Sequence, residues 1–397
     1  MKILLLDDEP YVLRLLTHQL AKLGFSEVIP HERAQDALAL LEKNMGAIGL
    51  VFCDLQMPEM DGVEFVRHLA RIGYAGGLVM VSGEDDRILK TAEKLALAHR
   101  LNVLGALHKP VSPEQLWQVL ENRPARAATP SDAKRQVYEP GDLKRAITNA
   151  ELVNYYQPKV EMVSGKVAGV ETLVRWRHPR DGLVFPDQFI PIAEEHGLID
   201  DLTRIVLSSA LRQARVWQDR NLHLHVAVNV SMDNLGNLDF PDLLAREAQK
   251  EGIALSSLLL EVTESRLMKN PTAPLDILTR LRLKHIGLSI DDFGTGHSSL
   301  AQLRDIPFNE LKVDRGFVHG ACRDTSLRTI FEASVGMARQ LGMQTVAEGV
   351  EDQDDWDFLR AAGCDLAQGY FIAKPMPADD LEPWLTDWET RRCKLLG

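Results

Sequence analysis

Polar and charged side chains end a series of short apolar runs in the second half of the chain. These residues are Asn229, Glu261, Asp291 and Asp292, Lys312 with Asp314, Glu348 and Gln368. Short runs separated by stretches with helical spacing indicate alternating strands and helices, whose functional groups collect at the carboxyl ends of the strands. Carboxylates gathered at one place are costly unless metal ions neutralise them. The pattern therefore predicts an active site that holds metal ions.

Alternation along the strands predicts which side chains share a face. In VETLVRW, Glu171 and Arg175 point to the same side of an extended strand, so a metal ligand and a phosphate clamp can share one site. Lys312 and Asp314 alternate in the same way. A lysine among carboxylates is either catalytic or part of a structural ion pair, and the parity with Asp314 favours catalysis. Glu264, three residues beyond Glu261, fits a helix cap or loop anchor as well as a ligand.

The first 120 residues carry a second cluster. Asp7 and Asp8 follow the first apolar run, Asp54 the third, Ser82 the fourth and Lys109 the fifth. Three carboxylates, a hydroxyl and a lysine in one crevice can hold Mg²⁺ and leave one aspartate as a nucleophile. Helix capping is the alternative, because Asp and Ser after a strand often cap the next helix. It explains a single residue better than it explains all five.

Apolar runs predict the elements that position both clusters. In the first part the runs are 3–6, 28–29, 50–53, 78–81 and 103–107, and in the second part they include 225–230, 258–262, 287–290, 311–313, 344–347 and 366–372. Five strands with helices between them predict a doubly wound, five-stranded parallel sheet. The longer series of strand and helix units predicts closure into a barrel. Both parts are therefore expected to be α/β.

Composition divides the chain and excludes several classes of protein. The stretch 121–141 is rich in Pro, Ala and charge, which predicts a first domain over 1–122, a linker over 123–140 and a second domain over 141–397. A net charge of -12 argues against binding to nucleic acid or an anionic membrane surface. No apolar stretch is long enough for a membrane span, Met1 opens no secretory signal, and the four cysteines lack metal-site spacing, so a cytoplasmic protein is expected.

The first domain resembles the receiver domain of bacterial response regulators. The resemblance rests on LLLDDEP, CDLQMPEMDG, VSGEDD and HKP. It implies a flavodoxin-like fold in which Asp54 accepts a phosphoryl group from a sensor histidine kinase or phosphotransfer protein. It also implies that Asp7 and Asp8 hold one Mg²⁺ and that Ser82 and Lys109 contact the phosphoryl oxygens. Ala106 stands where receivers commonly have an aromatic switch residue.

The second domain resembles the EAL-type cyclic di-GMP phosphodiesterases. The motifs YYQPKV, ETLVRW, VNVS, EVTES, DDFGTGHSSL, KVDRGFV, AEGVE and QGYFIAKPMP stand in the order of that family. The resemblance implies a TIM-like (β/α)8 barrel that hydrolyses cyclic di-GMP to linear pGpG. A receiver followed by such a domain is similar to the RocR and PvrR group of Pseudomonas response regulators. The sequence departs from the family at Thr172, in place of Ala, and at His297, in place of Tyr.

The resemblance also assigns roles to individual residues. The implied ligands of two Mg²⁺ or Mn²⁺ ions are Glu171, Asn229, Glu261, Asp291, Asp292 and Glu348; Glu348 and Lys312 are implied to be catalytic; Gln157, Arg175, Asp314, Glu351 and Gln368 are implied to contact the substrate; and Glu264 is implied to anchor a loop. Oxygen ligands suit Mg²⁺ and Mn²⁺. Two such ions can activate a water and stabilise an in-line attack on phosphorus. EAL domains often dimerise, so a homo-oligomer, a dimer or higher, is expected.

Two other classes of function compete with the enzyme. A related barrel can sense cyclic di-GMP without cutting it, or serve as a protein-interaction module. Such a barrel should have lost metal or base residues, whereas Glu171, Asn229, Glu261, Asp291, Asp292, Lys312 and Glu348 are all present. A transcription factor would need a basic recognition helix, which this acidic chain does not offer.

Overall fold

The computed structural model describes residues 2–44, 46–83, 86–121, 138–263, 272–294 and 300–396. The chain divides into two compact units, Met1–Ala133 and Lys134–Gly397. This boundary falls inside the predicted linker 123–140. Each unit has hydrophobic cores of its own.

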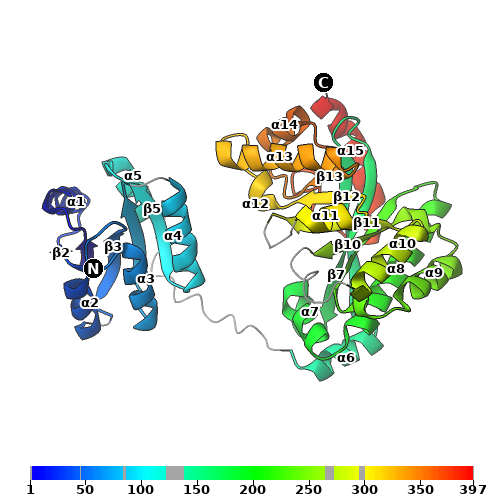
Figure 1. Cartoon of the computed structure of the whole chain (residues 1–397), viewed down its shortest axis with the longest axis horizontal. Helices are drawn as coiled ribbons and strands as arrows, with labels where there is room; N and C mark the ends of the chain where they lie inside the picture. The colour runs from blue at the N-terminus through cyan, green and yellow to red at the C-terminus, as the bar shows by residue number, and fades with distance from the viewer. Residues whose placement is uncertain are drawn as a thin grey trace. The chain divides into compact units, whose positions relative to one another are not determined.

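The first unit is built on a parallel sheet. Its strands are β1 (Lys2–Leu6), β2 (Val28–His31), β3 (Ile48–Asp54), β4 (Gly77–Ser82) and β5 (Asn102–His108). They pair in the order β2-β1-β3-β4-β5, and every pairing is parallel. Strands β2, β3 and β5 are labelled in Figure 1. All five strands predicted from the sequence are therefore present.

Helices cover both faces of this sheet. They are α1 (Pro10–Lys22), α2 (Ala34–Lys43), α3 (Gly62–Arg71), α4 (Asp86–Ala98) and α5 (Pro113–Glu121). Ile3 and Leu5 of β1 pack in a core with α1 and α5, whereas Leu4 and Leu6 pack in a core with α2, α3 and α4. This alternation follows from the period of two residues in a strand. The doubly wound fold is confirmed.

The second unit is a closed barrel of eight strands. Its strands are β6 (Leu152–Glu161), β7 (Val167–His178), β9 (His225–Val230), β10 (Leu258–Thr263), β11 (Gly287–Phe293), β12 (Glu310–Val313), β13 (Gln344–Ala347) and β14 (Leu366–Ala367), and β8 (Gly182–Val184) adds a hairpin to β7. β6 closes the ring by pairing with both β7 and β14, and both pairings are antiparallel. The TIM-like barrel is confirmed, with one of its strands reversed.

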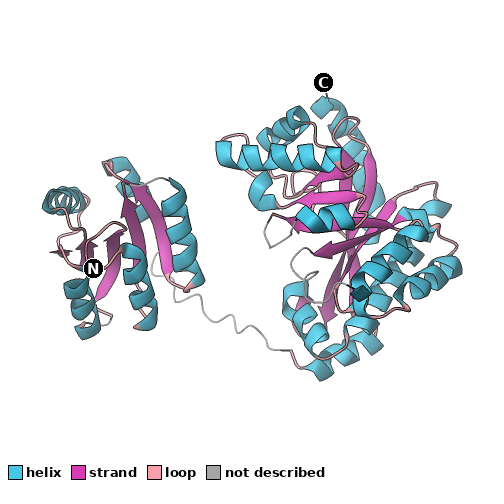
Figure 2. Ribbon diagram, viewed as in Figure 1, coloured by secondary structure: helices cyan, strands magenta, loops and turns pink. Residues whose placement is uncertain are grey.

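Helices surround the barrel (Figure 2). They are α6 (Pro140–Thr148), α7 (Pro186–Glu195), α8 (Ile199–Asp219), α9 (Phe240–Glu251), α10 (Thr272–Leu283), α11 (Leu300–Asp305), α12 (Arg315–Val318), α13 (Thr325–Gln340), α14 (Gln353–Ala362) and α15 (Leu381–Leu396), with 3-10 turns at Asn234–Gly236, Leu255–Ser257 and Ala378–Asp380. No helix in the described ranges is both long and apolar enough to cross a membrane.

The last strand is much shorter than the apolar run that predicted it. The run covers residues 366–372, but β14 ends at Ala367. Gly369 then lies so close to the loop after β13 that an added Cβ would stand 2.2 Å from the Val350 nitrogen. The N–H groups of Ile372 and Ala373 turn back to the Gly369 carbonyl at 3.0 and 2.9 Å. The remaining apolar residues therefore form a turn that packs on the barrel.

Candidate active site

The structure brings the acidic residues of the first unit together at the carboxyl ends of its strands. Asp7, Asp8 and Asp54 each offer a carboxylate oxygen, and these oxygens lie within 4.8 Å of one another. Lys109, just beyond β5, places its Nζ 2.9 Å from Asp7 Oδ2 and 3.0 Å from Asp54 Oδ2. Ser82 ends β4 and is fully buried. The topology thus joins residues as far apart in the sequence as Asp7 and Lys109.

Burial shifts the pKa values of two carboxylates in this cluster. It raises the pKa of Asp7 and of Asp54, and the hydrogen bonds from Lys109 offset only part of the effect. Burial opposes the charge on Lys109, but the hydrogen bonds to the two carboxylates outweigh it and raise the pKa of Lys109. Carboxylates held close together against their repulsion fit a small divalent cation, which prefers oxygen ligands.

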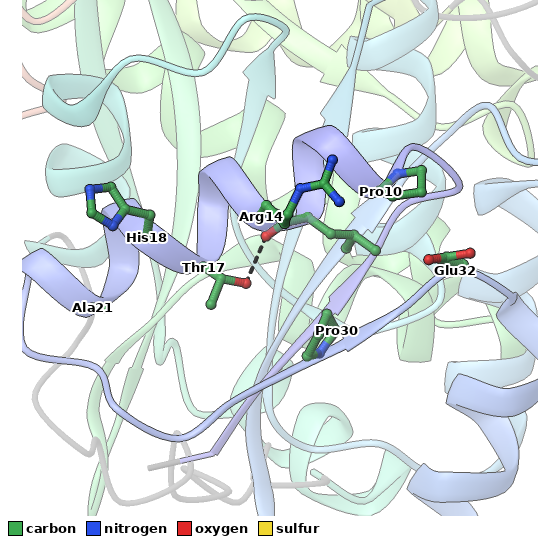
Figure 3. A pocket seen from close by; sticks show the side chains of 8 residues that line it. Pro10, Arg14, Thr17, His18, Ala21, Pro30 and Glu32 are labelled. Atoms are coloured by element: carbon green, nitrogen blue, oxygen red, sulfur yellow. Dashed lines mark hydrogen bonds between the residues drawn. The ribbon is translucent and has the colours of Figure 1, made fainter.

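A surface hollow of about 520 Å³ lies elsewhere on this unit (Figure 3). Its lining residues are Pro10, Leu13, Arg14, Thr17, His18, Ala21, Pro30 and Glu32. Most of them belong to α1, and Pro30 belongs to the edge strand β2. Thr17 donates its hydroxyl to the Leu13 carbonyl at 2.7 Å, so its polar group is satisfied within the helix. Asp7, Asp8 and Asp54 are not among the residues that line this hollow.

Lys312 stands at the centre of the carboxylates in the barrel. It lies on β12, and its side chain is 1% exposed. Its Nζ is 2.7 Å from Glu348 Oε1, 3.0 Å from Asp291 Oδ1, 3.1 Å from Glu261 Oε2 and 3.5 Å from Glu171 Oε2. The four acids come from or directly follow four different strands, β13, β11, β10 and β7. Only closure of the barrel brings them to one lysine.

Amide side chains hold Glu171 from two sides. Asn229 donates from Nδ2 to Glu171 Oε1 at 3.0 Å, and Gln368 donates from Nε2 to Glu171 Oε2 at 2.5 Å. Gln368 also donates to Gln157 Oε1 at 3.0 Å, and Gln157 donates to the Ala373 carbonyl at 2.9 Å. Gln368, expected from the sequence at the substrate, therefore orients the Glu171 carboxylate, and Gln157 accepts a hydrogen bond from Gln368. Gln368 Oε1 is buried without a hydrogen-bond partner among the described residues, which leaves an acceptor for a ligand.

A distortion of β11 turns two consecutive aspartates toward the same site. Successive side chains of a regular strand point to opposite faces. The register between β11 and β12 shifts between Ile290 and Phe293, and Asp292 adopts a positive φ of 54°. Oxygens of Asp291, Asp292 and Glu348 consequently lie within 4.8 Å of one another. An irregular strand of this kind re-aims side chains next to active sites.

Four carboxylates of the barrel have shifted pKa values: Glu171, Glu261, Asp292 and Glu348. Burial opposes the charge on Glu171, but Lys312 and the amides of Gln368 and Asn229 outweigh it and lower the pKa of Glu171 to about 2. Burial, together with repulsion from Asp291, raises the pKa of Asp292 to about 6 and that of Glu348 to about 8. Burial also raises the pKa of Glu261. The acids outnumber the buried lysines, so the donor set fits divalent cations, which favour oxygen ligands.

Sequence reasoning missed a second buried lysine beneath this site. Lys159 is 3% exposed, and its Nζ lies 3.4 Å from Glu261 Oε1 and 2.9 Å from Glu310 Oε1. Ser289 also donates to Glu310, at 2.9 Å. Lys159 lies two residues after Gln157 on β6, and Glu310 lies two residues before Lys312 on β12, so each pair shares a face of its strand. The parity argument that paired Glu171 with Arg175 was the signal that could have found both residues.

The other candidate residues are placed as follows. Arg175 is 7% exposed, and its guanidinium carbon lies 5.0 Å from the centre of the Phe185 ring. Asp314 accepts the N–H of Gly316 at 2.8 Å and so caps α12. Glu351 forms an ion pair with Arg315. The predictions for Glu264 and His297 concern positions outside the described residues.

Comparisons with known proteins cover both units. Residues 141–375 match the model of the EAL domain family, and residues 3–121 match the model of the response regulator receiver domain. Cyclic di-GMP phosphodiesterase RocR of Pseudomonas aeruginosa is 33% identical over 383 residues, which cover 95% of this chain and 96% of RocR. The bifunctional diguanylate cyclase/cyclic di-GMP phosphodiesterase MucR of the same species is 41% identical, over 63% of this chain and 37% of MucR.

Solved structures show the same barrel. The structure described as the PaMucR phosphodiesterase in complex with c-di-GMP aligns with a TM-score of 0.58 at 42% identity, covering 61% of this chain and 98% of that one. The EAL enzyme Bd1971, in a form bound to cAMP and cyclic di-GMP, aligns with a TM-score of 0.60 at 27% identity. That alignment covers 68% of this chain and 75% of the Bd1971 chain.

Proposed function

The chain belongs to the EAL domain family and carries a response regulator receiver domain before its EAL domain, and from this premise we propose that it hydrolyses cyclic di-GMP to linear pGpG. The observation that supports the proposal most strongly is the ring of four carboxylates around Lys312. A barrel that only binds its ligand has no need to hold so many buried acids together. Holding these acids together against their repulsion is costly, and such arrangements are typical of catalytic sites.

The acids and amides would hold two divalent ions, Mg²⁺ or Mn²⁺. EAL phosphodiesterase domains depend on divalent metal ions in general. Glu171, Asn229, Glu261 and Asp291 would hold one ion, and Asp291, Asp292 and Glu348 would hold or orient the other. When bound, such ions lower the pKa of a water and stabilise negative charge on phosphoryl oxygens. Asp291, which lies in both groups, would be the shared ligand.

The chain's own residues would position the attacking water and take its proton. Glu348 is the proposed general base, and its carboxylate is fixed by Lys312, 2.7 Å away. Burial raises the pKa of Glu348 in the absence of metal, and divalent cations bound beside it would favour the ionised form that can accept a proton. Lys312 would also balance charge that develops during the attack. Arg175 would offer its guanidinium to a phosphate of the substrate.

Turnover of cyclic di-GMP by the purified full chain tests this proposal. The reaction is run with Mg²⁺, with Mn²⁺ and with a chelator, and the product is then separated by chromatography. We expect pGpG only in the presence of metal, and we expect Glu348→Ala to bind cyclic di-GMP but to lose most turnover. The matched control is Glu382→Ala, since the side chain of Glu382 is 44% exposed and pairs with Arg220 at the surface. Binding without turnover by the unmodified chain would favour the alternative of a non-hydrolysing sensor.

We also propose that phosphorylation of Asp54 controls the enzyme. A sensor histidine kinase or phosphotransfer protein would supply the phosphoryl group, Asp7 and Asp8 would hold one Mg²⁺, and Ser82 and Lys109 would contact the phosphoryl oxygens. The contacts of Lys109 with Asp7 and Asp54 support this assignment.

Labelling with a small phosphodonor tests the assignment of Asp54. We expect one base-labile phosphoryl group on the full chain, absent in Asp54→Asn and retained in Asp36→Asn. Asp36 is a suitable control because it is an exposed aspartate in the first turn of α2. A label that persists in Asp54→Asn would place the acceptor elsewhere.

A further inference from the structure

A buried carboxylate outside the proposed metal ligands joins two loops at the mouth of the barrel. Asp355 lies in the first turn of α14 and is 1% exposed. Its Oδ1 accepts the N–H of Gly320 at 3.1 Å, and its Oδ2 accepts the N–H of Glu351 at 3.1 Å. Nδ1 of His319 lies 2.9 Å from the same Oδ2. Both oxygens of Asp355 are therefore engaged by hydrogen-bond donors.

The donors come from the segments that follow two neighbouring strands of the active site. His319 and Gly320 follow α12. This helix begins at Arg315, and only Asp314 separates it from the last residue of β12. Glu351 lies three residues after Glu348, in the loop between β13 and α14. Asp355 thus ties the segment beyond Lys312 to the segment that carries the proposed general base.

Close packing leaves these two segments little room to shift independently. Gly349 has a φ of +67°, and an added Cβ would stand 2.3 Å from Arg315 Cγ. The N–H of Glu348 donates to the Val313 carbonyl at 3.1 Å. Arg315 pairs with Glu351, whose carboxylate is also 3.8 Å from His319 Nε2. Glu348 is therefore held between β12 on one side and the hydrogen bonds of Asp355 on the other.

Distance alone would also allow a metal ion at this place. One possible ligand atom from each of His319, Asp352 and Asp355 lies within 4.8 Å of the others. Their atoms already have other partners, however. Asp352 Oδ1 accepts the N–H of Asp355 at 2.9 Å and caps α14. Asp355 uses both oxygens on backbone donors and His319. These contacts indicate a structural clasp, and they give no support for an ion.

We propose that Asp355, together with His319, is a positioning residue that fixes the loop carrying Glu348 and thereby sets the rate of turnover. The proposal rests on the proposed function, since Glu348 is taken to be the general base. Hydrogen bonds from backbone N–H groups to a carboxylate are charge-assisted and directional, so they hold a loop in one place. A catalytic group that is displaced by about 1 Å can lose about a hundredfold in rate.

Paired substitutions in the full chain test the clasp. Asp355→Asn keeps the size of the side chain but turns one acceptor into a donor that faces a backbone N–H. We expect turnover to fall by about tenfold to a hundredfold, while KM changes by less than about threefold. Asp354→Asn is the matched control, because Asp354 is an exposed acid in the same helical turn and pairs with Arg323 at the surface. It should behave as the unmodified chain.

His319 gives a second, independent pair of variants. His319→Ala removes the donor, whereas His319→Asn keeps an N–H donor near the position of Nδ1. His319 is 45% exposed, so neither change should prevent folding. We expect turnover to fall in His319→Ala and to recover largely in His319→Asn. Equal turnover in the two variants, or unchanged turnover in Asp355→Asn, would overturn the proposal.

Amide hydrogen exchange separates the clasp from the activity itself. In the unmodified chain the N–H groups of Gly320 and Glu351 should be protected, and in Asp355→Asn and His319→Ala their exchange should be faster. This measurement needs no substrate, so it tests the clasp even if the protein fails to hydrolyse cyclic di-GMP. Unchanged exchange at both amides would refute the clasp. Absence of turnover in the unmodified chain would instead refute the proposed function.

Discussion

Removal of the charge on Lys312 tests the view that the barrel site is built around an excess of negative charge. In Lys312→Met the length of the side chain is roughly kept, but four acids at 2.7 to 3.5 Å lose their shared cation. Each contact is worth several kcal/mol at an effective dielectric constant of about 20, before the cost of desolvation. Removal of one partner from a buried ion pair costs about 3–5 kcal/mol.

We therefore expect the metal-free variant to lose about 3–5 kcal/mol in the free energy of unfolding. Protonation of Glu348 or Glu261 would relieve part of the repulsion, which places the expected value toward the lower end of that range. Divalent ions would replace the missing charge. Saturating Mg²⁺ should consequently stabilise Lys312→Met more than it stabilises the unmodified chain.

Urea unfolding followed by tryptophan fluorescence measures this difference in the full chain, with a chelator and with Mg²⁺. The signal reports mainly on the barrel, because five of the six tryptophans lie there: Trp176, Trp217, Trp356, Trp384 and Trp388. The control is Lys250→Met, which removes an exposed lysine 3.8 Å from Glu247 and should change stability by less than about 0.5 kcal/mol. If Lys312→Met were as stable as the unmodified chain without metal, or gained no more from Mg²⁺, the electrostatic reasoning would be wrong.

Two further predictions concern pH and packing. The pKa values of Asp292, about 6, and Glu348, about 8, are raised above those of exposed carboxylates. The two groups therefore contribute their full stability to the metal-free fold at acidic pH, and this contribution is lost as the pH rises through about 6 and about 8. Unfolding midpoints measured with a chelator from pH 5 to 9 should therefore fall less steeply in Glu348→Gln, and Mg²⁺ should bind more tightly as the same protons leave. Gly369→Ala should lower the free energy of unfolding by about 1–3 kcal/mol, because its Cβ would stand 2.2 Å from the Val350 nitrogen. Gly336→Ala in α13, where a Cβ has open space, should be neutral or stabilise by up to about 1 kcal/mol, and equal stability of the two variants in urea unfolding would contradict this packing argument.

The sequence by itself determined the fold class and pointed to most of the acids that the structure brings together. Apolar runs with polar ends predicted both sheets, because burial of a strand on two faces demands continuous apolar residues. The strand 225–230 was predicted with the bounds that the structure shows. Parity along the strands predicted that Glu171 shares a face with Arg175, and that Lys312 shares a face with Asp314. The acids of both clusters were found because several strands in each domain end in a polar or charged residue, and helix capping explains one such residue better than it explains a whole set.

Only the tertiary structure decided how these residues work together. The distances from Lys312 depend on closure of the barrel, which the reversed strand β6 completes. The shared direction of Asp291 and Asp292 depends on the shift in register between β11 and β12, which local periodicity does not predict. Lys159 contacts Glu261 and Asp355 contacts Gly320, and these partners are remote in sequence, so the contacts became visible only in the folded chain. Sequence periodicity encodes which face a side chain takes, whereas contacts between strands and loops arise from the packing of the whole chain.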